Sequence, residues 1–185
     1  MKLPLLALLP LLLLPAPACA TAAPAEYRRL IQDFLDAEPP YCLGETQWPV
    51  VSRSGEAPWL AGRLHALVDA GLARRSQNGR QAVYQLSKTG EQWYGGNGDL
   101  CYGRMEIGRI NHIEAINDGM VAVSYYYRLK GLAPWAYHPT LRFAFSEMDQ
   151  MVGGMDKTRY QVIINTALGG APKLQNYPSP VEMDY

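Results

Sequence analysis

The sequence predicts a mixed α+β fold, in which helices and a hairpin are followed by an antiparallel sheet with one packed helix. Three observations support this order. Apolar residues recur at helical spacing in residues 26–37 and 58–70. Asn78-Gly79 separates two extended runs, which is a strong hairpin signal. Residues 121–130 alternate between apolar and polar positions, which is typical of a half-buried strand.

Two amphipathic helices are expected in the first half of the chain. Pro39-Pro40 ends the first, and Pro58 suits the first turn of the second, which runs to Ala70. The apolar residues of the first helix lie on one face, at Tyr27, Leu30, Ile31, Phe34 and Leu35.

The predicted hairpin leads into a short helix over residues 87–94. The glycine-rich segment 95–98 then marks the clearest boundary inside the chain. We therefore expect one structural unit at residues 26–94 and a second, an antiparallel α+β unit, at residues 99–168.

The second unit begins with a strand over residues 103–116. Its alternation changes parity, and a bulge near Arg109 accounts for the change. A turn at residues 117–119 leads to the antiparallel strand 121–130. The two strands therefore form a hairpin.

A helix and a last strand complete the second unit. Residues 139–152 carry an apolar stripe at helical spacing, and residues 159–167 read as a strand. The proline-containing tail, residues 169–185, is expected to be loose.

Part of the first unit resembles winged-helix domains. Residues 64–75 read LHALVDAGLARR and residues 84–90 read YQLSKTG, which match the hydrophobic and glycine positions of that family. The resemblance implies that residues 58–94 form a winged-helix-like unit. It also implies that the helix before the hairpin is a DNA-recognition helix and that the hairpin is the wing.

The charge of the chain argues against a nucleic-acid partner. The chain holds 17 basic and 17 acidic residues, and without Lys2 the acidic residues exceed the basic ones by one. DNA-binding domains are normally basic on at least one face and often overall. We therefore expect no nucleic-acid partner and interpret the winged-helix-like segment as a compact scaffold.

The first 20 residues read MKLPLLALLPLLLLPAPACA and have the features of an export signal: one Lys, a leucine-rich run and a final Ala-Cys-Ala. The run is too short and too rich in proline for a spanning helix, which needs about 20 apolar residues. Cleavage after Ala20 would release a soluble protein. Cleavage before Cys19 would leave a lipid there and tether the protein to a membrane. Either route predicts an exported protein of the bacterial periplasm.

Cys42 and Cys101 form an even pair in an oxidising compartment, so we predict a disulfide between them. Their spacing is not the C-x-x-C of a redox pair. A zinc site would need further cysteine or histidine ligands nearby.

No catalytic residue, metal ligand or cofactor is assigned from the sequence. The motifs G-x-S-x-G, S-x-x-K and H-E-x-x-H are absent. His65 lies at the edge of a helical stripe, and His138 precedes a helix. His112 shares a strand face with Glu114, and an exposed polar face accounts for this pair as well as a partial metal site does.

The best candidate for a contact surface is a group of aromatic and basic residues around the end of the strand 121–130. Tyrosine, tryptophan and arginine are favoured at the energetic centres of protein interfaces. The predicted binding residues are Tyr126, Arg128, Trp135, Tyr137 and His138.

Three functions compete for this sequence. The first is a non-enzymatic envelope protein that binds another protein, either as an immunity or inhibitor protein or as an accessory subunit. The second is a small-ligand-binding protein with a pocket between the sheet and the helix at 139–152. The third is a hydrolase with an unfamiliar site around His112 or His138. The absence of catalytic motifs favours the first function.

Overall fold

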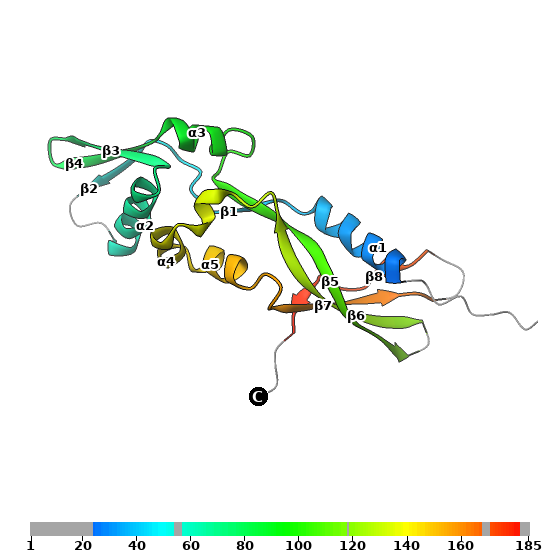
Figure 1. Cartoon of the computed structure of the whole chain (residues 1–185). Coiled ribbons are helices and arrows are strands. Elements are labelled where there is room, and N and C mark those ends of the chain that lie inside the picture. Colours follow the sequence, from blue (N-terminus) through cyan, green and yellow to red (C-terminus); the bar gives the residue numbers. More distant parts are fainter. Residues whose placement is uncertain (1–23, 54–56, 118, 168–170, 182–185) are drawn as a thin grey trace, which may run out of the picture.

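The computed structural model describes residues 24–53, 57–117, 119–167 and 171–181. Within these residues the chain has a mixed α+β architecture of five α-helices and two antiparallel sheets (Figure 1). This agrees with the predicted fold class. The predicted export signal and Cys19 lie outside the described residues.

The smaller sheet has three strands in the order β2-β4-β3. The expected hairpin is confirmed, because β3 (Ala73–Asn78) pairs with β4 (Gln81–Leu86) across the Asn-Gly turn. β2 (Val50–Arg53) adds the third strand, which the sequence did not predict. α2 (Pro58–Asp69) precedes the hairpin and α3 (Lys88–Tyr94) follows it, both as expected.

The larger sheet is curled, and its strands follow the order β1-β5-β6-β7-β8, with β9 also paired to β7. Its centre is the antiparallel hairpin of β5 (Cys101–Asn117) and β6 (Met120–Lys130). β1 (Tyr41–Cys42) pairs with one side of this hairpin and β7 (Arg159–Asn165) with the other. The register of β5 shifts between Ile107 and Ile110, which confirms the predicted bulge, and shifts again between Ile110 and His112.

The expected single helix over residues 139–152 is two helices. α4 (Pro139–Ala144) and α5 (Ser146–Gly153) are separated at Phe145, whose φ of −123° and ψ of 83° are not helical. The apolar stripe still faces inward on both helices, at Leu141, Phe145, Met148 and Val152. The sequence pattern therefore identified the buried face but not the break.

The helix that packs most extensively on the larger sheet comes from the first half of the chain, whereas the main strands of that sheet come from the second half. α1 (Pro24–Ala37) lies against β5 (Figure 1). The Arg28 side chain donates hydrogen bonds to the carbonyl oxygens of Ile107 and Gly108, at 2.9 and 2.6 Å. The Ile107 amide donates to Gln32 Oε1 at 2.9 Å. These contacts join α1 to the bulged part of β5.

Each of the two predicted units therefore contributes a helix that packs on the other unit. α1 belongs to the predicted 26–94 unit but packs on the larger sheet, whereas α4 belongs to the 99–168 unit but packs on α2. One contiguous core runs through both halves. It is rich in tyrosine, and burial raises the pKa of Tyr102 to about 12.

The described part of the tail is not loose. β8 (Lys173–Leu174) and β9 (Ser179–Pro180) both pair with β7. The Asn176 side chain also accepts a hydrogen bond from the Ile163 amide at 2.7 Å. The high proline content of this segment limits the length of its strands but does not prevent their pairing.

Candidate functional site

A wide groove of about 770 Å³ is lined by residues of α2 and α4. These two helices lie beside one another at one end of the molecule (Figure 1). The floor of the groove is made of small or compact residues. Gly62 and Ala66 come from α2 and Ala144 comes from α4, while Pro58 and Pro139 begin the two helices. A Cβ added at Gly62 would meet no atom within 4 Å, so the groove is open above this position.

Two aromatic side chains stand at the rims of the groove. Trp59 on α2 is 63% exposed and Phe143 on α4 is 94% exposed. Exposed single apolar residues are common, but two large rings beside one apolar hollow are typical of an interaction site.

The position of Phe143 follows from helical geometry. Leu141 and Phe145 are four residues apart, so they share one face of α4, and both are buried. Phe143 lies midway between them in the sequence and therefore points to the opposite side. Packing of the inner face of α4 thus forces the Phe143 ring into solvent.

Arg63 connects the groove to the rest of the fold. Its guanidinium lies 4.4 Å from the ring centroid of Phe145, donates to the Leu43 carbonyl at 2.6 Å, and pairs with Glu45 at 3.1 Å. Burial raises the pKa of the Glu45 carboxyl, although the Arg63 charge opposes this rise. The Arg63 charge is therefore already engaged within the protein.

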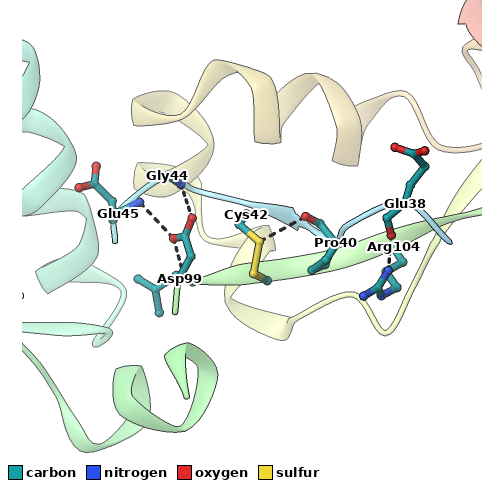
Figure 2. Close-up of a disulfide and its surroundings, with 9 residues drawn as sticks. Glu38, Pro40, Cys42, Gly44, Glu45, Asp99 and Arg104 are labelled. Carbon is teal, nitrogen blue, oxygen red and sulfur yellow. Dashed lines mark hydrogen bonds between the residues drawn. A yellow bond between two sulfur atoms is a disulfide. The ribbon is translucent and has the colours of Figure 1, made fainter. Parts of the chain in front are cut away.

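The segment that holds Glu45 is fixed by a buried carboxylate (Figure 2). Asp99 is only 8% exposed and accepts hydrogen bonds from the amides of Gly44 at 2.8 Å, Glu45 at 3.0 Å and Leu100 at 2.6 Å. Three backbone donors can stabilise a carboxylate that is removed from water. Asp99 thus anchors the loop that carries Glu45, the ion-pair partner of Arg63.

The predicted disulfide is confirmed. Cys42 on β1 is bonded to Cys101, which faces it at the start of β5, next to the Asp99 loop (Figure 2). Such a bond is consistent with an oxidising location outside the cytoplasm.

The five predicted binding residues lie at three separate places. Tyr126 and Arg128 are on the outer face of the larger sheet, where Tyr126 stacks beneath Arg109 at 3.8 Å and Arg128 pairs with Asp156 at 2.9 Å. Tyr137 is exposed at the end of the 3₁₀ helix η1 (Pro134–Tyr137). His138 follows, with Nδ1 2.8 Å from the hydroxyl of Thr140, a residue of the groove.

Trp135, which was predicted to be a contact residue, is buried in the structure. It is 8% exposed, and its ring packs edge-on against Trp93 and Tyr102. The core extends to η1 because α4 and α5 fold back beside this segment. Composition alone cannot distinguish such a core aromatic from an interface aromatic.

The histidines do not belong to a metal-binding cluster among the described residues. No group of three His, Cys, Asp or Glu side chains there is arranged to hold a metal ion. His65 lines the groove and lies near Tyr84, with ring centroids 6.0 Å apart. His112 and Glu114 line a separate hollow on the outer face of the larger sheet.

Sequence reasoning missed Trp59 and Phe143, although a signal was present. Both are large aromatic residues outside the apolar stripes of their helices, which run through Leu60, Leu64 and Leu67 on α2 and through Leu141 and Phe145 on α4. An aromatic residue on the solvent side of an amphipathic helix is the pattern to look for.

In the part of the chain that the structure describes, every helix is too short or too polar to cross a membrane. No protein-family model, curated protein or solved structure matches this chain.

Proposed function

We propose that this is an exported, non-enzymatic protein of the bacterial envelope that binds another protein through the groove between α2 and α4. Its partner inserts apolar side chains between Trp59 and Phe143, as the target of an immunity or inhibitor protein or of an accessory subunit would. The observation that carries the proposal is the pair of exposed rings, 63% and 94% exposed, beside an apolar floor.

The energetics favour a partner that covers both rims. Transfer of one large apolar side chain from water to a packed interface contributes about 1.5–3 kcal/mol. Aromatic residues that enter a desolvated pocket are the usual energetic centres of interfaces. The small floor residues of the groove leave room for a partner's side chain between the two rings.

The same geometry supports a scaffold role for the winged-helix-like segment. A DNA-recognition helix must lie with its outer face free to enter the major groove. Here α4 packs on α2, and Phe143 stands beside the face that would approach DNA. Arg63 on that helix is paired with Glu45. These features support a protein partner and no nucleic-acid partner.

The position of α1 fits either form of the mature protein. α1 begins at Pro24, at the end of the molecule away from α2 and α4 (Figure 1). A lipid on Cys19 would tether the chain five residues before Pro24. The groove residues are the same in the soluble and the lipid-anchored form.

Site-directed photo-cross-linking in the native cell envelope tests this function. A photoreactive amino acid replaces Phe143 in one variant and Ile116 in the control. Ile116 is an apolar residue of β5 that is 50% exposed but lies outside the groove. We expect one stoichiometric partner at position 143 and none at position 116.

Affinity measured with the purified partner completes the test. Phe143→Ala and Trp59→Ala should each weaken binding by about 30-fold, as expected for interface hot spots, while Ile116→Ala leaves affinity unchanged. The proposal fails if position 143 yields no adduct, or if both positions capture the same set of proteins.

A further inference from the structure

We propose that a polar hollow on the outer face of the larger sheet binds a short peptide of two or three residues through its free amino and carboxyl ends. This site is distinct from the groove between α2 and α4 and does not depend on it. The hollow measures about 410 Å³ and is lined by Asn111, His112, Glu114, Ala122, Ser124, Arg159 and Gln161.

The hollow forms because short side chains on a central strand lie between longer side chains on the two neighbouring strands. Ala122 and Ser124 lie on the central strand β6 and have short side chains. In the register of the sheet, Glu114 faces Ala122, while His112 and Gln161 face Ser124 from either side. Longer side chains on β5 and β7 thus form walls around a low centre. The alternate residues of β6, such as Val121 and Val123, point into the core instead.

A bulge adds one further polar group to the wall. Between Ile110 and His112 the register of β5 shifts by one residue, so Asn111 is the extra residue. A bulged residue departs from strict alternation, and Asn111 lines the hollow beside its neighbour His112. Bulges occur preferentially next to functional sites, where they redirect a side chain.

The hollow contains two opposite charges that the described residues do not pair. Arg159 and Glu114 both line it, but neither takes part in the three ion pairs found in the described chain. The contrast on the same face is Arg128, which lies 2.9 Å from Asp156. The charges in the hollow therefore remain available to a ligand of complementary charge.

The register also sets the distance between the two charges. Arg159 is paired with Tyr126 of β6, and Glu114 is paired with Ala122 of the same strand. The positions of the two charged residues therefore differ by four residues along β6. At about 3.4 Å per residue this separates the two residues by about 14 Å along the strands, and two strand spacings add about 10 Å across the sheet. The Cα atoms of the two residues are therefore about 17 Å apart, and side chains that extend toward one another would shorten the distance between their charges.

A short peptide matches this arrangement. Extended residues span about 3.3–3.6 Å each, so two or three residues cover about 7–11 Å between a terminal ammonium and a carboxylate. Arg159 would bind the carboxylate with paired N–H donors, and Glu114 would accept from the ammonium. The amides of Asn111 and Gln161 can donate to and accept from the peptide groups in between.

Calorimetric titration of the mature protein with trialanine tests this inference, alongside two capped forms. N-acetyl-trialanine lacks the ammonium, and trialanine amide lacks the carboxylate. We expect uncapped trialanine to bind and each cap to weaken binding by about tenfold or more. Arg159→Gln and Glu114→Gln should each produce the same loss.

The pairing of each variant with one cap makes the test specific. The Glu114→Gln variant should bind N-acetyl-trialanine as weakly as it binds trialanine. The Arg159→Gln variant should likewise bind trialanine amide as weakly as it binds trialanine. Arg74→Gln, an exposed arginine on β3, is the matched control and should bind like the unmodified protein. The inference is overturned if trialanine fails to bind at millimolar concentration, or if capped and uncapped peptides bind equally.

Discussion

The guanidinium carbon of Arg63 lies 4.4 Å from the centroid of the Phe145 ring, at the residue where α4 ends and α5 begins. Arg63 also donates to the carbonyl of Leu43. One side chain of α2 thus connects the groove to the helical break on one side and to the loop after β1 on the other.

Replacement of Arg63 should therefore reduce stability. Arg63→Ala removes a hydrogen bond from a charged donor, an ion pair with the 12%-exposed Glu45 side chain, and the contact with the Phe145 ring. We expect the free energy of unfolding, measured with urea, to fall by about 2–3 kcal/mol. Arg74→Ala, on the exposed hairpin, should change it by less than about 0.5 kcal/mol. Equal effects of the two substitutions would contradict this role of Arg63.

Glu45 should make stability depend on pH in a defined direction. Burial raises the pKa of its carboxyl above the ordinary value of 4.5; Arg63 opposes this and Asp99 adds to it. The folded protein then keeps a proton that the unfolded chain has already lost, so the free energy of unfolding falls as pH rises from 4.5 to the raised pKa. Glu45→Gln removes this dependence. Urea unfolding of both proteins between about pH 4 and pH 7 should show the variant gaining stability relative to the original as pH rises.

Loss of the disulfide should be costly because it closes a long loop. The bond joins residues 59 positions apart, for which chain-entropy arguments give about 4 kcal/mol. We expect Cys42→Ala/Cys101→Ala to lower the free energy of unfolding by about this amount. The original protein in reductant should approach the same value, and an unchanged unfolding midpoint in both cases would refute the expectation.

Trp135 and Phe143 should respond in opposite ways to truncation, although both are aromatic residues of the same region. Trp135→Ala creates a cavity in the core and should cost about 3–5 kcal/mol of stability. Phe143→Ala removes a ring that is 94% exposed and should change stability by less than about 0.5 kcal/mol, while it weakens partner binding. Thermal and urea unfolding of the two variants separate a core residue from a groove residue.

Gly90 should tolerate no side chain, because a Cβ there would overlap the carbonyl oxygen of Leu72. Gly90→Ala is therefore expected to cost about 1–3 kcal/mol. Gly96→Ala is the control, since a Cβ at that position would meet no atom within 4 Å. The two melting temperatures should differ clearly, and similar values would show that α3 can shift away from Leu72.

Local patterns were sufficient for most of the individual elements. The helical spacing of Tyr27, Ile31 and Leu35 predicted a helix with the face that is in fact buried, and Asn78-Gly79 predicted the hairpin turn. The parity change near Arg109 predicted a bulge. In each case the signal lies within a few residues of the feature, because backbone preferences and side-chain periodicity act locally.

The candidate site was not predictable in the same way. The patch proposed from residue types included Trp135, which is in the core, and omitted Trp59 and Phe143, which border the groove. The local sequence around an aromatic residue does not show whether a distant helix covers it. Its exposure depends on how α4 packs on α2, and these segments are separated by some 70 residues of sequence, so no local pattern records it.

The sequence by itself determined the α+β class, the hairpin, the amphipathic faces and the cysteine pair that forms a disulfide. Only the tertiary structure decided that α1 packs on β5, that α4 packs on α2, and that Ala122 and Ser124 lie at the bottom of a polar hollow. The physical reason is that periodicity specifies which face of an element must be buried, whereas the element that covers it is selected by packing of the whole chain.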